Sequence, residues 1–164
     1  MADVELFGIQ AAVARHGDAP QLGELVAGVW RDRPVIALFA HDDDGPHYII
    51  LNGEDGRFDF TDHTGLTAVQ AVQGELIIEP ADGVVPYALP FAEPEGSALV
   101  ITQSGDIGLR VTLPNPSSPG RPWIIMNSVR TGEPIPTGPR VLLRGFHLLL
   151  KIEGREKAIP IGSY

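Results

Sequence analysis

Residues 140–152 read Arg-Val-Leu-Leu-Arg-Gly-Phe-His-Leu-Leu-Leu-Lys-Ile, the most regular apolar pattern in the chain. Apolar side chains occupy odd positions before Gly145, at Val141 and Leu143, and even positions after it, from Phe146 to Ile152. Alternation with a period of two is typical of a β-strand with one buried face, and a bulge shifts that alternation by one position. Glycine suits a bulge because the extra residue often needs a positive φ. The stretch therefore predicts a strand with a bulge at Gly145.

Turn residues punctuate the rest of the chain at short intervals. Residues 153–156, Glu-Gly-Arg-Glu, predict a hairpin turn, with the final strand returning through residues 157–159. Most successive turn pairs are 8 to 13 residues apart, and they are Asp44-Gly45, Asn52-Gly53, Thr64-Gly65, Gln73-Gly74, Asp82-Gly83, Glu95-Gly96, Ser104-Gly105 and Glu153-Gly154. Short strands at this spacing predict an all-β fold, an antiparallel sandwich or barrel of about ten to twelve strands. We expect one β domain over residues 1–164, because no repeat or boundary is visible.

The apolar content of each segment indicates where it lies in the fold. Residues 57–61 and 108–113 alternate between apolar and polar side chains, which predicts one solvated face. Residues 35–40 and 98–101 are apolar at consecutive positions, which predicts strands covered on both faces, near the centre. Trp30 and Trp123 are expected to be core anchors, because an indole buries a large area.

Helices and proline-rich connections complete the expected architecture. Residues 4–16 fit either a strand or a short helix, and residues 66–73 are a second place for one, so we expect at most one or two short helices. Prolines gather in residues 86–94, 114–122 and 134–139. Each proline removes a donor from a sheet, so these stretches are predicted to be loops or extended arms and not central strands.

Composition excludes several classes of protein. The chain has no cysteine, which rules out disulfides, thiolate metal sites and cysteine nucleophiles. Its apolar runs are far shorter than the roughly 20 residues of a membrane-spanning helix, and its acidic N-terminus lacks a signal-like apolar stretch. A net charge of −9 opposes binding to nucleic acid. We therefore expect a cytoplasmic protein that binds neither membranes nor nucleic acid.

Charge is divided by position along the chain. Residues 1–109 carry 18 acidic and 4 basic side chains, whereas residues 110–164 carry 3 acidic and 8 basic side chains. Such a division bears on association and on the sign of a ligand. The two parts are expected to face each other either within one molecule or between molecules.

The densest polar region, residues 41–65, contains the ingredients of a metal site. If residues 42–46 form a five-residue hairpin loop, His41 and His47 lie opposite each other with Cβ atoms about 5 Å apart. Asp62 and His63 from the next hairpin could then complete a set for a divalent metal. The favoured interpretation is simpler, because polar residues at turn tips are ordinary turn chemistry. No calcium-loop, nucleotide-binding or nucleophile motif is present in the sequence.

The basic part of the chain suggests a different kind of site. Arginine recognises carboxylates and phosphates through paired donors, so Arg121, Arg130, Arg140 and Arg144 are candidates for an anion site or an interface with an acidic partner. The alternative is that each is a separate solvated side chain.

These observations favour a non-catalytic binding or assembly protein. It is expected to self-associate, as a homo-oligomer, or to dock to a protein partner through its basic C-terminal third and its acidic loops. No cofactor is expected. The alternative is a metal-dependent β-barrel enzyme that uses the histidine and aspartate cluster of residues 41–63.

Overall fold

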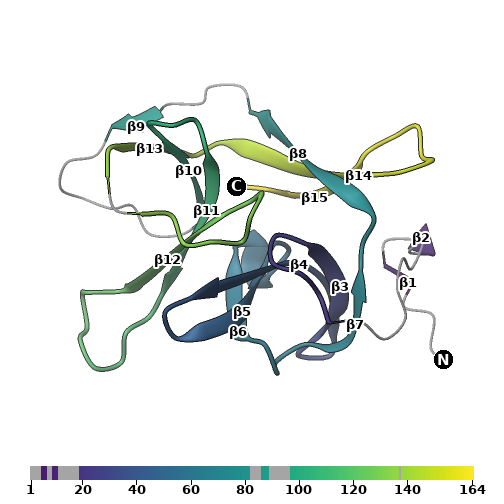
Figure 1. Ribbon diagram of the computed structural model, residues 1–164, viewed down its shortest axis with the longest axis horizontal. Helices are drawn as coiled ribbons and strands as arrows, with labels where there is room; N and C mark the ends of the chain where they lie inside the picture. The colour runs from purple at the N-terminus through teal and green to yellow at the C-terminus, as the bar shows by residue number, and fades with distance from the viewer. Residues whose placement is uncertain (1–4, 7–8, 11–18, 82–85, 89–96, 137) are drawn as a thin grey trace.

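The computed structural model describes residues 5–6, 9–10, 19–81, 86–88, 97–136 and 138–164, and these are almost entirely β-structure (Figure 1). Their only helical segment is the 3-10 turn η1 (Glu54–Gly56). All strand pairs are antiparallel, and they form three main sheets and one small pair, β1 (Glu5–Leu6) with β2 (Ile9–Gln10). Each main sheet has edge strands, so the architecture is the sandwich and not the closed barrel. The predicted all-β class is confirmed.

The first sheet is built from the N-terminal half of the described chain. Its strands run in the order β6-β5-β4-β3-β7. Their bounds are β3 (Leu25–Trp30), β4 (Arg33–Asp42), β5 (Gly45–Ile50), β6 (Asp59–Asp62) and β7 (Thr67–Ala71). Strand β6 is at the edge of this sheet and, among the described strands, pairs only with β5, so its other edge faces the space beside the sheet.

The second and third sheets contain the remaining strands. The second has the order β12-β11-β10-β13-β9, with β9 (Pro86–Ala88), β10 (Ala98–Thr102), β11 (Ile107–Leu113), β12 (Trp123–Ser128) and β13 (Arg140–Leu143). The third has the order β15-β14-β8, with β8 (Gly74–Pro80), β14 (Phe146–Ile152) and β15 (Ile159–Ser163). In Figure 1 the β11–β12 hairpin lies near β5 and β6, and the β14–β15 hairpin projects on the other side.

One apolar cluster connects the three sheets. It includes Leu38 and Ile49 of the first sheet, Leu99 and Leu109 of the second, and Phe146 of the third. Removing these side chains from water is the main favourable contribution to folding. Residues 35–38 of β4 and 98–100 of β10 are at most 2% exposed, and both strands lie inside their sheets. The prediction that they are central strands is confirmed.

The stretch around Gly145 differs from its prediction. Residues 140–152 form two strands in two sheets, β13 and β14, and Gly145 is the corner between them with φ of 76°. Its N–H donates to the Tyr164 carbonyl at 3.0 Å, and its carbonyl accepts from the Ala81 N–H at 2.7 Å. The even-numbered apolar residues 146–152 are buried, as predicted. A change of sheet therefore takes the place of the predicted bulge. Before Gly145, Leu143 packs against the main cluster, but Val141 is exposed and the even-numbered Leu142 is fully buried in another cluster, so the predicted burial of odd positions holds only in part.

The remaining connections agree only in part with the predictions made from the sequence. Residues 153–158 join β14 to β15 as the predicted hairpin, although the last strand begins only at Ile159. Residues 66–73 contain strand β7, so the helix considered there is wrong, and Leu66 and Val69 pack against Trp30 in a second cluster. Of residues 4–16, most lie outside the described residues.

The proline-rich stretches lie outside the central strands wherever the structure describes them. Residues 114–122 link β11 to β12, and the loop that begins after β12 carries Pro134, which bridges to Asn127. Strand β9 is at the edge of its sheet, and residues 89–96 lie outside the described residues. In the described part of the chain, no helix is long and apolar enough to span a membrane.

Candidate functional site

A groove of about 850 Å³ lies between the first and second sheets, beside their edge strands β6 and β12; we call it the Trp123 groove. One wall comes from β4 to β6 and consists of Asp42, Asp44, Gly45, Pro46, His47, Phe60 and Asp62. The other comes from the β11–β12 hairpin and consists of Leu113, Pro114, Pro122, Trp123, Ile124 and Ile125. The site is thus apolar on one side and acidic on the other.

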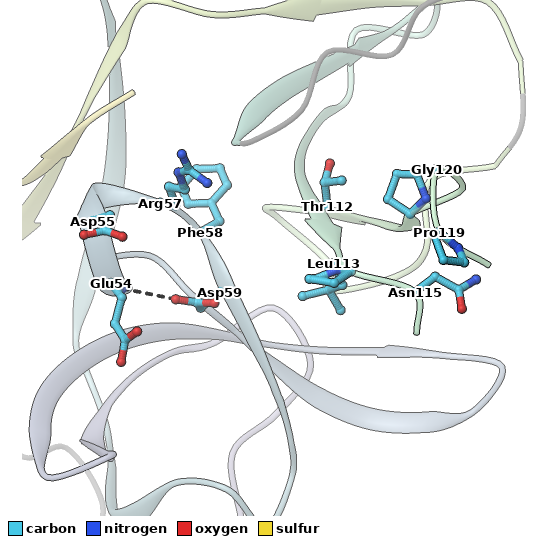
Figure 2. Close-up of a pocket in the computed structure, with 12 residues that line it drawn as sticks. Glu54, Asp55, Arg57, Phe58, Asp59, Thr112, Leu113, Asn115, Pro119 and Gly120 are labelled. Atoms are coloured by element: carbon cyan, nitrogen blue, oxygen red, sulfur yellow. Dashed lines mark hydrogen bonds between the residues drawn. The ribbon is translucent and has the colours of Figure 1, made fainter. Parts of the chain in front are cut away.

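A second groove, of about 620 Å³, borders the first and is shown in Figure 2. Residues 54–59 face residues 112–120 across it, and we call it the Arg57 groove. Leu113, Pro114 and Pro122 line both grooves, so the loop of residues 114–122 is a shared boundary.

The shared loop is shaped by its own polar groups. The side chain of Asn115 accepts from the Ser117 N–H at 3.0 Å, its carbonyl accepts from the Ser118 N–H, and the Ser118 carbonyl accepts from the Arg121 N–H. Asparagine and serine stabilise turns through such local bonds, and prolines fix φ. The loop is therefore an ordered turn at the mouth of both grooves.

Asp59 is the most enclosed acidic group of the Arg57 groove. Burial raises the pKa of its carboxyl, while the hydrogen bond from the Glu54 N–H, at 3.1 Å, acts in the opposite direction (Figure 2). Desolvation disfavours the charged form of a carboxyl group.

His47 lies in the inner wall of the Trp123 groove and is 2% exposed. Its ring packs on Phe60 with 4.9 Å between centroids, and its Nε2 is 3.0 Å from Asn127 Oδ1. The Asn127 amide nitrogen donates to the carbonyls of His41 and Gly132, so the oxygen of that amide faces His47. An amide oxygen only accepts, so Nε2 carries a proton, which leaves Nδ1 as an acceptor when the ring is neutral.

Asn127 also connects the two sheets that form the groove. It belongs to β12 and is fully buried, whereas His41 and His47 belong to β4 and β5. Buried polar groups in folded proteins are hydrogen-bonded, and the Asn127 side chain makes three hydrogen bonds. The Asn127 side chain therefore fixes the separation of the two walls at this point.

The predicted pairing of His41 with His47 is wrong. Strand pairing places Pro46 opposite His41 and Ala40 opposite His47, because Asp42 pairs with Gly45 and leaves a two-residue turn. Gly45 permits that turn with φ of 124°, and the Asp42 carboxylate accepts from the Asp44 N–H at 2.9 Å. Successive side chains alternate between faces, so the two histidines lie on opposite faces of the first sheet.

The other predicted metal ligands are divided in the same way. Asp62 is the strand partner of His47 and lines the same groove, whereas His63 is exposed in the following turn. Hydrogen bonds from the Thr64 hydroxyl and N–H lower the pKa of Asp62. Among the residues that the structure describes, no three histidine or acidic side chains come together in a way that could hold a metal ion. His41, His47, Asp62 and His63 are not assembled into one site.

His41 instead contacts a residue that the sequence did not single out. Its Nε2 is 2.6 Å from Oε2 of Glu133, and this hydrogen bond is the main cause that raises the pKa of His41. Glu133 follows Gly132, whose φ of 69° returns the chain along β12. The glycine at position 132 indicated a turn, but nothing local in the sequence indicated that Glu133 would contact His41.

The four candidate arginines do not form one patch. Arg121 and Arg130 are exposed before and after β12, whose six residues span about 20 Å. Arg140 begins β13, and Arg144 follows its last residue at the corner before Gly145. Each of these two already has an interaction partner.

Trp123 was predicted to be a core anchor, and this prediction is wrong. Trp30 is 6% exposed and belongs to the core, as predicted, but Trp123 is 54% exposed and lines the groove. Its position directly after Pro122, at the end of a proline-rich loop, was the available signal.

Comparison with known proteins finds no match to this chain among protein-family models, curated proteins or solved structures. The chemistry of the two grooves is therefore the basis for a functional conclusion.

Proposed function

We propose that this chain is a non-catalytic binding protein that docks a segment of a partner protein in the Trp123 groove. The observation that carries the proposal is a half-exposed tryptophan in an apolar wall, across the groove from a wall with three carboxylates. Tryptophan is enriched among the few residues that dominate binding energy at interfaces. A groove of about 850 Å³ is within the usual range for ligand sites, roughly 300–1,000 Å³.

The rigidity of the walls supports this proposal. His47, Phe60 and Asn127 are held by packing and by hydrogen bonds behind the groove. A site whose walls are already ordered loses less conformational entropy when a ligand binds. The acidic loops expected to dock a partner include Asp42, Asp44 and Asp62 of this groove.

The proposal is tested by selecting displayed random peptides on the wild-type protein and measuring their affinity for two variants. We expect enriched peptides to bind Trp123→Ala at least tenfold more weakly. Leu22→Ala, which truncates another exposed apolar side chain outside the groove, should bind them as the wild type does. Failure to enrich any peptide, or equal loss in both variants, would contradict docking in this groove.

Self-association is a second candidate function, favoured by the division of charge. Three exposed basic side chains, Lys151, Arg155 and Lys157, outnumber the exposed Glu153 and Glu156 on or beside the β14–β15 hairpin, which projects away from the β11–β12 hairpin in Figure 1. A contact between unlike surfaces of two copies produces rings or filaments. In this form the acidic grooves of one copy meet the basic hairpin of the next.

A further inference from the structure

The charge of the Trp123 groove limits what it can bind. Its lining includes Asp42, Asp44 and Asp62 but no lysine or arginine. The low pKa of Asp62 keeps that carboxylate ionised at neutral pH. A ligand that fills the groove therefore has to supply positive charge or leave carboxylates desolvated without a counter-charge.

The Asp42 carboxylate beside buried His47 favours a hydrogen-bonding cation. Nδ1 of His47 has no hydrogen-bond partner in the structure, although the side chain is 98% buried, and it is 3.7 Å from Oδ2 of Asp42. The two oxygens of the Asp42 carboxylate match the paired N–H donors of a guanidinium better than the single centre of an ammonium group.

Trp123 provides a face for the same cation. The other tryptophan, Trp30, already has the Arg31 guanidinium 4.3 Å from its ring centroid. Among the described residues, no such cation lies over Trp123, which is 54% exposed. Arginine on a tryptophan face is attracted by the ring quadrupole.

The edge of β12 favours a peptide over a free cation as the ligand. The segment that returns along β12 bonds to Met126 and Ser128: the Ile135 N–H donates to the Met126 carbonyl, and the Ser128 N–H donates to the Glu133 carbonyl. Backbone groups alternate in direction along a strand, so those of Ile124 point to the same side. Within the described part of the chain, nothing pairs with Ile124 on that side. An edge with a free donor and acceptor can accept another strand.

We infer that the Trp123 groove binds an extended, arginine-bearing segment of a partner protein, with the segment's backbone pairing with Ile124 and its guanidinium lying between Trp123 and the Asp42 carboxylate. This inference rests on the proposed function and specifies its ligand.

The experiment uses fluorescently labelled ten-residue peptides of alternating threonine and valine with one central arginine, and anisotropy at low salt as the readout. Replacing the central arginine with lysine should weaken binding severalfold, and replacing it with glutamine should weaken binding at least tenfold. N-methylation of alternate backbone amides should abolish binding in one set, the set that faces β12, and not in the other. Equal affinity of the arginine and glutamine peptides, or equal effects of the two methylated sets, would overturn the inference.

Protein variants locate the contact. Trp123→Ala and Asp42→Asn should each weaken the arginine peptide at least tenfold, whereas Asp43→Asn removes the same charge from a side chain outside the groove and should change affinity less than twofold. Near-ultraviolet circular dichroism checks that the variants are folded. Equal effects of Asp42→Asn and Asp43→Asn would overturn the inference, and so would competition by free spermine at the concentration of the peptide. Either result would show that the groove attracts cations in general.

The two proposals fail in different ways. Selected peptides that depend on Trp123 but contain no arginine would remove this inference and leave partner docking in the groove. The absence of any ligand sensitive to Trp123→Ala would remove both.

Discussion

At the scale of single residues, Asn127 has the clearest structural role. It makes three hydrogen bonds, two of them across the boundary between two sheets, and its amide oxygen faces Nε2 of His47. Nothing in the sequence around residue 127 indicated this, because its partners are five residues away in one case and 80 or more in the other two. Long-range polar contacts depend on register, which local patterns do not specify.

Replacing Asn127 should destabilise the fold. In Asn127→Leu the buried N–H of His47 loses its acceptor and the carbonyl of His41 loses its donor, which should lower the free energy of unfolding by about 1–3 kcal/mol. Urea denaturation followed by circular dichroism measures the difference. Gln103→Ala, which removes an exposed amide, is the control and should change stability by less than about 0.5 kcal/mol. Equal stability of Asn127→Leu and the wild type would show that the sheets are not held here.

At the scale of elements, the sequence indicated strands better than their partners. The apolar runs of β4 and β10 identified central strands, because burial on both faces leaves a continuous pattern. The phase change at Gly145 was detected, but a bulge and a change of sheet produce the same shift of parity. The β4–β5 turn was expected to be longer than it is, and the error moved His41 to the wrong face.

The corner at Gly145 should not tolerate a side chain. A φ of 76° costs an L-residue about 1–2 kcal/mol, so Gly145→Ala should lower the free energy of unfolding by roughly that amount. Gly138→Ala is the matched control, because Gly138 has no positive φ and no atom within 4 Å of an added Cβ. Thermal unfolding of the two variants measures both effects. A destabilisation by Gly138→Ala as large as that by Gly145→Ala would contradict the assigned cause.

At the scale of the whole molecule, composition predicted class but not assembly. The spacing of glycine and proline identified an all-β fold because turns must interrupt short strands. The sign of the charge along the chain can be counted from the sequence, but the position of each charge on the surface depends on the fold. The four arginines considered for one anion site are spread over the two ends of β12 and of β13, and the sequence did not specify those positions.

Self-association, if it uses the β14–β15 hairpin, should depend on salt. Light scattering should report a mass above one chain in about 10 mM salt and close to one chain in about 500 mM salt, because exposed charges are screened within a few ångströms at high ionic strength. The triple variant Lys151→Glu, Arg155→Glu, Lys157→Glu should remain at the mass of one chain in both. A wild-type mass that is the same at the two salt concentrations would contradict assembly through charge.

The two-residue turn between Asp42 and Gly45 has an evolutionary consequence. Strand neighbours obey an odd-even rule, so a shift of the β4–β5 register by one residue, after a single codon is gained or lost there, would place both imidazoles on one face of the sheet. Changes of two codons would preserve the present arrangement. Whether the number of residues in this turn is odd or even therefore decides whether the two histidines lie on one face of the sheet or on two.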